Sequence, residues 1–276
     1  MGFYNRVSNG WEVAKTSFQV LRAHKELIVF PILSAISILL VLGSFCTLTL
    51  YSAGWNVDNL QLNNRALLYL CIFLFYIVNY FIVVFFNMAL MHCAKLYFDG
   101  EEVTVAKGLS FSLSRIKAIL SWAVFAATVG VILKIAQDNL GWIGRMIISF
   151  VGIVWSVATF FVIPVIAYEN VGPYDALKRS GHIMREKWGE GISANFSLGL
   201  VSLLCIIPVA VVGMGVTALV NEGLGIGIMV AGVLAIIAVF SALHSIFISA
   251  IYNNINGNIN DHFNQQMIEG LFEPKR

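Results

Sequence analysis

Six long stretches without a single charged residue are the feature that most limits how this chain can fold. They cover residues 27–57, 66–94, 118–133, 146–168, 191–221 and 223–260. A helix needs roughly 20 apolar residues to cross the bilayer's hydrocarbon core. The third stretch reaches this length if Lys134 extends its ammonium group to the membrane interface. We therefore predict six transmembrane helices, at residues 27–51, 66–92, 117–137, 145–168, 192–220 and 225–252.

The composition agrees with lipid as the solvent. Charged residues make up 12% of the chain and apolar residues 59%, whereas soluble domains carry about 25% charged residues. The expected fold is all-α, a polytopic membrane helical bundle that forms one integral membrane domain over residues 1–276. Within it we expect a cytoplasmic amphipathic helix at 1–25, the six-span bundle at 26–252 and a cytoplasmic tail at 253–276.

The distribution of lysine and arginine predicts the orientation, because short cytoplasmic loops are enriched in these residues. Fourteen of the 17 cations lie before the first span, between spans two and three, between spans four and five, or in the tail. Only Arg65, Lys134 and Arg145 fall on the opposite side. We expect a multi-pass protein of the bacterial inner (plasma) membrane with both termini in the cytoplasm.

A threefold pattern precedes the odd-numbered spans, because each of these cytoplasmic segments has apolar residues at helical spacing. The stripes are Val7, Trp11, Ala14, Phe18 and Leu21; then Val105, Leu109, Ile116 and Leu120, with Ser112 interrupting; then Tyr174, Leu177, Gly181, Met184 and Trp188. The pattern predicts three units, each made of an amphipathic helix and a transmembrane hairpin.

These segments carry the basic residues that we predict to contact lipid headgroups: Lys15, Arg22, Lys25, Lys107, Arg115, Lys117, Lys178, Arg179, Arg185 and Lys187. Each cation near an anionic leaflet contributes about 1 kcal/mol of attraction. The expected partner is therefore anionic lipid on the cytoplasmic side. The simpler interpretation, helices resting at the headgroup boundary, is favoured about two to one over a regulatory or partner-binding role.

Polar side chains inside the spans are the other candidates for function. Tyr69, Tyr76, Tyr80 and Asn87 share one arc of the second span, with Asn79 at its edge, and His244 lies in the sixth span. We predict that these six residues line a pore or cavity, with a satisfied interhelical network as an equal alternative for the stripe. The ladder Ser241, Ser245 and Ser249 is favoured as packing, as are the pairs Gly223/Gly227 and Ala126/Gly130.

Several functional classes have no support in the sequence. All acidic residues map to loops or helix ends, no hydrolase motif is present, and His244 has no second ligand at helical spacing. The four cysteines are expected to be small buried hydrophobic residues. We expect no catalytic residues, no metal, no cofactor and no nucleic-acid binding. Pro164 and Pro208 are expected to interrupt the fourth and fifth spans.

Three blocks of sequence carry a resemblance to a known family. They are FYNRVSNGWEVAKTSFQVLRAHKELIVFPILS, ENVGPYDALKRSGHIMREKWGEGISANFSLGL and AIYNNINGNINDHFNQQMIEGLFEPKR. In this order they resemble an uncharacterised bacterial family of multi-span membrane proteins, a domain of unknown function. The middle block is also distantly similar to the membrane region associated with glycerophosphodiester phosphodiesterases. The resemblance implies a six-helix inner-membrane fold and supplies neither an activity nor site residues.

Two functions follow as expectations. The first is a homo-oligomeric, non-enzymatic channel or passive transporter for a small solute or ion. The alternative is a lipid-binding or scaffolding protein that acts through its basic amphipathic helices. We also expect the last span to end near Asn256-Gly257 and the tail at 261–276 to fold back on the cytoplasmic helices.

Overall fold

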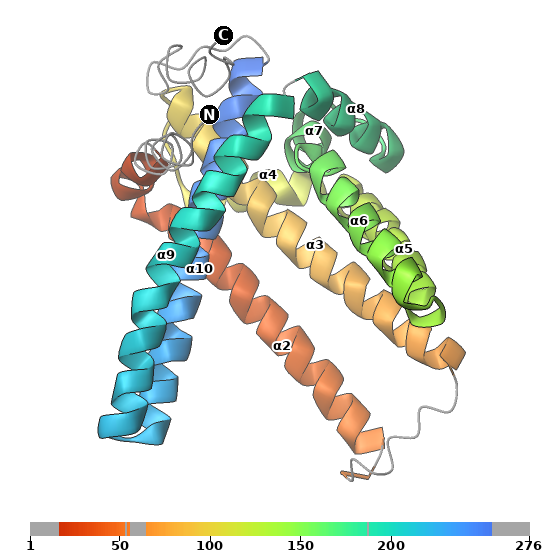
Figure 1. The fold of residues 1–276 in the computed structure, drawn as a ribbon. Helices are drawn as coiled ribbons and strands as arrows, with labels where there is room; N and C mark the ends of the chain where they lie inside the picture. Colours follow the sequence, from red (N-terminus) through yellow and green to blue (C-terminus); the bar gives the residue numbers. More distant parts are fainter. Residues whose placement is uncertain (1–16, 53, 56–64, 187, 256–276) are drawn as a thin grey trace. The chain divides into compact units, whose positions relative to one another are not determined.

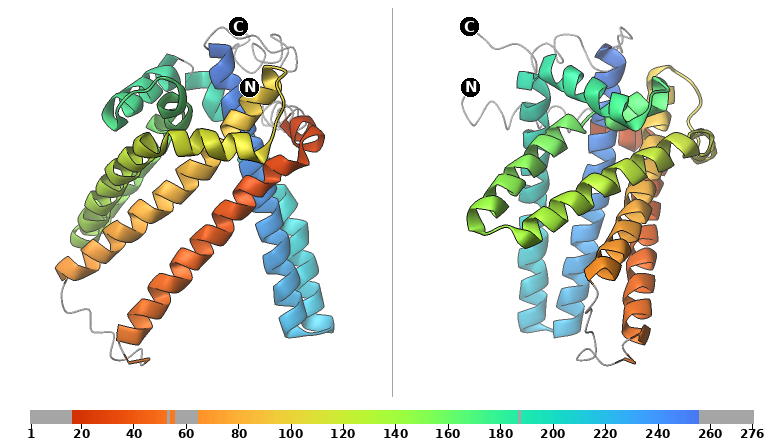
Figure 2. Two further views of the ribbon diagram at one scale, coloured as in Figure 1. Left: turned by 180° about the vertical axis from the view of Figure 1, so that it is seen from behind. Right: turned by 90° about the vertical axis from the view of Figure 1, so that its right-hand side faces the viewer.

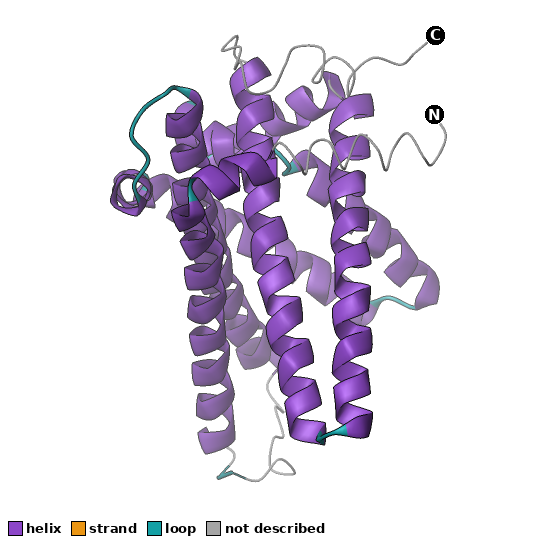
Figure 3. Cartoon of the chain, turned by 90° about the vertical axis from the view of Figure 1, so that its left-hand side faces the viewer, coloured by secondary structure: helices purple, strands orange, loops and turns teal. Residues whose placement is uncertain are grey.

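The computed structural model describes residues 17–52, 54–55, 65–186 and 188–255, and all regular structure in these ranges is helical (Figure 3). Residues 17–23 form a helix that leads into a short 3-10 helix, η1 (Lys25–Ile28). The remaining helices in Figure 1 are α2 (Val29–Ser52), α3 (Arg65–Phe98), α4 (Val105–Ser114), α5 (Ile116–Asn139), α6 (Trp142–Ala158), α7 (Val162–Tyr168), α8 (Pro173–Glu186), α9 (Trp188–Leu219) and α10 (Glu222–Ile255).

The six predicted spans are confirmed as helical segments long and apolar enough to cross a membrane. They correspond to α2, α3, α5, the pair α6 and α7, α9, and α10. Large apolar side chains such as Leu40, Phe150 and Val212 are more than half exposed along them. Such exposure is the expected state of side chains whose solvent is lipid.

The ends of the helices differ from the predicted spans, most clearly at the end of α3. Helix α3 continues past residue 92 to Phe98, and within this extension Lys95 pairs with Asp99 one turn later. It ends in a C-terminal motif in which Gly100, with φ of 72°, follows the last turn. The N–H groups of Gly100 and Glu101 donate to the carbonyls of Tyr97 and Leu96. This pair of bonds satisfies carbonyls that the helix end leaves open.

The chain divides into two compact units. The first contains the described parts of Met1–Ile32, Leu90–Gly108 and Arg185–Arg276, and the second contains Leu33–Ala89 and Leu109–Met184. Helices α2, α3, α4 and α8 each contribute residues to both units.

The dominant feature of the first unit is the antiparallel hairpin of α9 and α10, whose helices lie side by side (Figure 3). Their approach is close enough to require glycine. A Cβ atom added to Gly232 would lie 2.5 Å from Val209, one added to Gly213 would lie 2.6 Å from Met229, and one added to Gly225 would collide with the backbone of Thr217. Small residues permit such close packing in lipid, where no hydrophobic effect drives helices together.

The predicted contact pair Gly223/Gly227 is therefore wrong. Gly227 has open space at its Cβ position, and among the described residues the only close neighbour of Gly223 is Asn221, directly before the helix. The interface instead uses Gly225, which lies on another face of the same helix. In the sequence, the closely spaced glycines at the start of α10 did not by themselves reveal which face meets α9.

The C-terminal half of α10 is buried within the first unit. Ile246, Phe247 and Ala250 are almost completely inaccessible, and α10 contacts η1. The hydroxyl of Ser249 donates to the carbonyl of Met91 over 3.1 Å. The packing interpretation of the serine ladder is thus confirmed for Ser249. The described helix ends at Ile255, so the predicted docking of residues 261–276 lies outside the described residues.

The second unit contains the hairpin of α5 and α6, visible as two adjacent helices in Figure 2. The rings of Trp122 and Trp155 are stacked, with centroids 6.1 Å apart and planes 6° from parallel. Helix α5 also meets α3, since a Cβ atom added to Gly130 would lie 3.1 Å from the ring of Tyr76. Ala126 is buried one turn earlier. The predicted contact surface at Ala126 and Gly130 is therefore confirmed.

The fourth span is interrupted between α6 and α7. Pro164 has no N–H to offer the carbonyl of Phe160, and its ring would clash with that carbonyl in a straight helix. Helix α6 accordingly ends at Ala158, and α7 begins at Val162. Helix α9 is assigned as continuous through Pro208, so the expected interruption there is not observed.

Candidate functional site

The predicted polar stripe of α3 is partly occupied by helix packing. Tyr76 and Tyr80 lie against α5 at Gly130, with the Tyr80 hydroxyl 3.8 Å from the position of an added Cβ. Their two rings are in edge contact, with centroids 6.3 Å apart. Asn79 donates to the carbonyl of Phe75 in its own helix over 2.8 Å. For these three residues the structure shows interhelical and intrahelical contacts.

The remaining predicted cavity residues are also partly covered. Tyr69, Asn87 and His244 are half-buried, and the last two take part in polar or ring interactions. The stripe of α3 belongs to the second unit, whereas His244 belongs to the first. Neither unit by itself therefore contains all six residues.

The basic residues are the more exposed set. Arg22, Lys25, Lys107, Lys117, Lys178 and Arg185 are exposed, and Arg115 and Arg179 are half-buried. Lys15 and Lys187 lie outside the described residues. In the described part of the chain the only carboxylate within 4.0 Å of any of the six exposed cations is Glu102, beside Lys107. Most of this positive charge is therefore left for another partner.

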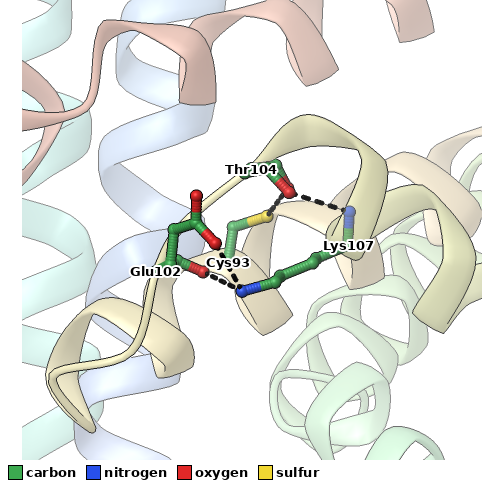
Figure 4. A network of polar contacts seen from close by, with 4 residues as sticks. All are labelled: Cys93, Glu102, Thr104 and Lys107. Atoms are coloured by element: carbon green, nitrogen blue, oxygen red, sulfur yellow. Dashed lines mark hydrogen bonds and ion pairs between the residues drawn. The ribbon is translucent and has the colours of Figure 1, made fainter.

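Lys107 belongs to a small network at the start of α4 (Figure 4). Its ammonium donates to the backbone carbonyl of Glu102 over 2.9 Å and to its carboxylate over 3.3 Å. The Thr104 hydroxyl accepts the backbone N–H of Lys107, which caps the helix. The Cys93 thiol donates to the Thr104 carbonyl over 3.4 Å. This network fixes the first turn of α4 to the end of α3.

A buried serine anchors α4 within the second unit. Ser112 is fully buried, and its hydroxyl donates to the carbonyl of Phe85 in α3 over 2.9 Å. Ser112 had been expected to interrupt the apolar stripe of this segment. It instead belongs to the buried face, while Ile116 and Leu120 are 42% and 48% exposed. The predicted stripe is therefore wrong at its C-terminal end.

Helix α8 is anchored in the same way. Ser180 is fully buried, and its hydroxyl accepts the backbone N–H of Phe161 over 2.9 Å. That N–H lies in the break before Pro164, where regular helical bonding is lost. The buried face of α8 is Ala176, Ser180, Ile183 and Met184, whereas the predicted stripe contained Tyr174, which is 68% exposed. The backbone N–H of Phe161 needs an acceptor because the span is broken there, and this need determines which face of α8 is buried.

The three predicted amphipathic segments share a feature that sequence reasoning missed. Ser17 is also fully buried, so each segment buries one serine. Five residues after each serine stands an exposed cation, namely Arg22, Lys117 and Arg185. Ser112 was interpreted as an interruption of its stripe, whereas Ser17 and Ser180 lie directly beside residues of the other two predicted stripes.

Two arginines converge on adjacent residues of the loop between α7 and α8. Arg115 donates through Nη1 to the side-chain oxygen of Asn170 over 3.1 Å. Arg179 donates through Nε to the carboxylate of Glu169 over 3.2 Å. Asn170 has φ of 50°, a left-handed conformation that asparagine tolerates better than most residues. The fold thus brings together two of the predicted headgroup-contact residues.

Aromatic rings support this pair. The Arg115 guanidinium carbon lies 5.9 Å from the centre of the Phe111 ring, at cation–π distance. Phe111 in turn packs on Tyr168, with centroids 5.6 Å apart. Asn170, Glu169 and the two rings were not among the predicted site residues. The contacts of Asn170 and of the two rings join segments more than 50 residues apart, whereas Glu169 meets Arg179 across the loop before α8.

The described residues contain no group of three or more His, Cys, Asp or Glu side chains that could hold a metal ion. The arrangement offers fixed cationic hydrogen-bond donors at the end of an apolar span. Donors of this kind can hold an anion.

Comparison with known proteins assigns a family. Residues 66–261 match the model of DUF6159, a family of unknown function. The chain belongs to this family. The match covers α3 to α10 and therefore includes both anchoring serines of α4 and α8 and the arginine pair. No curated protein matches the chain.

Proposed function

We propose that this chain is a non-enzymatic lipid-binding scaffold, which gathers anionic phospholipid headgroups at one membrane face through cations on its short helices and at the ends of its spans. The observation that carries the proposal is the exposure of Arg22, Lys25, Lys117, Lys178 and Arg185. None of them has a carboxylate within 4.0 Å in the described part of the chain. By contrast, Lys134 is paired with Asp138 over 2.8 Å.

Chain topology supports a common face for these cations. Helix α4 follows the second candidate span and α8 follows the fourth, so two crossings separate them. The helix at 17–23 precedes the first span. If each span crosses once, all three helices lie on the same side. We propose that this side is the cytoplasmic face of a bacterial inner membrane, with both chain termini on it.

The anchors give the cations a fixed position. The hydrogen bond from Ser112 to Phe85 and the bond from Phe161 to Ser180 each tie a short helix to a span. A helix so tied does not have to reorganise when a headgroup arrives, and preorganisation lowers the cost of binding. Each anchor thereby holds the cations of its own segment in place.

The test is thermal unfolding of the full chain in neutral detergent, with added phosphatidylglycerol or phosphatidylcholine. We expect stabilisation by phosphatidylglycerol alone, because a ligand that binds only the folded state at 100 times its Kd adds about 2.7 kcal/mol. The triple variant Lys117→Gln, Lys178→Gln, Arg185→Gln should lose most of this shift. The matched control is Arg145→Gln, an exposed cation predicted to lie on the opposite face. Equal stabilisation of the wild type by both lipids would refute the proposal.

A passive path for a small solute is the second candidate. It is favoured by the half-buried Asn87 and Tyr69, polar residues on a helix otherwise suited to lipid. Such a path would be completed by assembly of several copies of the chain. Solute efflux from vesicles with the reconstituted protein, compared with Asn87→Leu, tests this candidate. Permeability equal to that of protein-free vesicles would exclude it.

A further inference from the structure

The Arg115 and Arg179 pair keeps most of its donor capacity and an excess of positive charge. A guanidinium carries five N–H donors, and each of these side chains has one hydrogen bond assigned to it. Glu169 neutralises Arg179, whereas Asn170, the partner of Arg115, is a neutral amide. In the described residues no carboxylate lies within 4.0 Å of Arg115. The pair therefore remains a receptor for an anion.

The pair lies at the end of a membrane span. Tyr168 is the last residue of the candidate span Trp142–Tyr168, and the two loop residues that hold the arginines follow it directly. Tyrosine is enriched where spans leave the hydrocarbon, at the depth of the headgroups. The Phe111 ring lies beneath the Arg115 guanidinium. A ligand at this place meets positive charge and an aromatic surface together.

The N–H donors of the two guanidinium groups suit a phosphate group better than chloride. A phosphate group offers several oxygens, so two separate guanidinium groups can each donate to it. Arginine is also suited to this task because its planar donors match two oxygens at once. Both side chains are already fixed by the loop, which reduces the ordering that binding requires.

Apolar side chains next to the site favour a lipid over free phosphate. Leu113, Ile116 and Leu120 are all more than 40% exposed, and they flank Arg115 along the chain. A free phosphate ion would gain nothing from them, whereas the acyl chains of a lipid would cover them. We propose that Arg115 and Arg179 bind the phosphate group of one anionic glycerophospholipid, whose chains lie over this apolar surface. This proposal rests on the lipid-binding function and names the residues of one defined site.

Native mass spectrometry of the full chain with phosphatidylglycerol resolves successive bound lipids and gives the Kd of the first. Arg115→Gln and Arg179→Gln should each raise this Kd about tenfold, which corresponds to about 1.4 kcal/mol. The matched control is Arg145→Gln, which removes the same charge from an exposed residue near the other end of the fourth span. It should change the Kd of the first lipid less than about twofold, because we predict that Arg145 lies on the opposite membrane face.

Two further variants separate binding from folding, since they alter the partners of the arginines. Glu169→Gln removes the carboxylate that competes for Arg179, so it should lower the Kd about threefold, a gain of about 0.6 kcal/mol. Asn170→Asp gives Arg115 a carboxylate partner and should raise the Kd about tenfold. A merely structural role for these contacts would not produce tighter binding in Glu169→Gln.

The possible results distinguish this site from the general function. If both arginine variants bind the first lipid as Arg145→Gln does, while the triple surface variant still loses lipid-dependent stability, the site is refuted and the lipid-binding function stands. If the wild type does not distinguish phosphatidylglycerol from phosphatidylcholine, the function itself fails. Inorganic phosphate that stabilises the chain as strongly as phosphatidylglycerol at equal concentration would identify a free-phosphate site and overturn the lipid assignment.

Discussion

The α9 and α10 hairpin and the short helix α8 are held in place by different physical means. In the hairpin, missing side chains at Gly213, Gly225 and Gly232 let two apolar helices approach closely. In α8, a buried hydroxyl satisfies a backbone N–H that a broken span leaves open. The first contact depends on shape and the second on a hydrogen bond. A long apolar hairpin and a short connecting helix are thus held by different interactions within one chain.

The largest effect is expected on the close packing between α9 and α10. Gly225→Leu places a side chain into the backbone of Thr217, so it should destabilise the chain by at least about 3 kcal/mol, the upper end of the usual cost of overpacking. Unfolding of the full chain in detergent, followed by tryptophan fluorescence, measures the change. Gly227→Ala is the control, since its Cβ enters open space and should add about 0.5–1 kcal/mol of stability. Similar behaviour of both variants would show that the hairpin is loosely packed.

The next largest effect is expected on the hydrogen bond that holds α8 in place. Ser180→Ala leaves the buried N–H of Phe161 without its acceptor, which should cost about 1–3 kcal/mol in the same unfolding measurement. Ser114→Ala serves as the control. That serine is exposed and donates only to Phe111 in its own helix, so its loss should stay within about 0.5 kcal/mol. Equal losses in both variants would contradict an anchoring role for Ser180.

A smaller effect is expected at Ser112, the serine that anchors α4. Ser112→Ala removes a donor to the carbonyl of Phe85, which lies inside a continuous helix and keeps its place in the helical ladder. Because no buried group is left wholly unsatisfied, the cost should be about 0.5–1.5 kcal/mol. If Ser112→Ala lowered the free energy of unfolding more than Ser180→Ala does, the broken fourth span would not be the reason that the α8 anchor matters.

The smallest effect is expected at an exposed ion pair. Asp138→Asn removes the partner of Lys134, one helical turn away. Exposed pairs at this spacing contribute about 0.3–0.5 kcal/mol, so stability should change by no more than that and should depend on salt. A double-mutant cycle with Lys134→Gln measures the coupling. Coupling above about 1 kcal/mol would place this pair in a less hydrated environment than the predicted interface.

The number of spans was predictable because each depends only on local composition. A run of about 20 apolar residues identifies a span whatever packs beside it. The break before Pro164 was also predictable, since it follows from the missing N–H of proline. At Pro208 the same rule predicted an interruption that is absent, because helices in lipid tolerate proline where neighbouring groups compensate.

Helix faces could be predicted only in part, because they depend on what the opposite helix offers. Gly130 was correctly placed in a contact surface, and its partner proved to be Tyr76, a residue predicted to line a cavity. Ser112 was missed because a polar residue within an apolar stripe suggests a boundary, and Ser180 was missed because it lies beside the predicted stripe. Each is buried where its hydroxyl forms a hydrogen bond with a backbone group of a span. The Arg115 and Arg179 pair depends on tertiary contacts that no local pattern reveals.

The most direct test of the account is the membrane side on which its cations lie. Single cysteines replacing Lys117, Lys178 or Arg145 would be introduced into a chain whose four native cysteines are changed to alanine, and an impermeant maleimide would be applied to intact bacterial inner-membrane vesicles of known orientation. The account predicts that Lys117→Cys and Lys178→Cys react from the cytoplasmic side and Arg145→Cys from the other. Labelling of Lys117→Cys and Lys178→Cys from opposite sides would contradict the shared lipid-binding face.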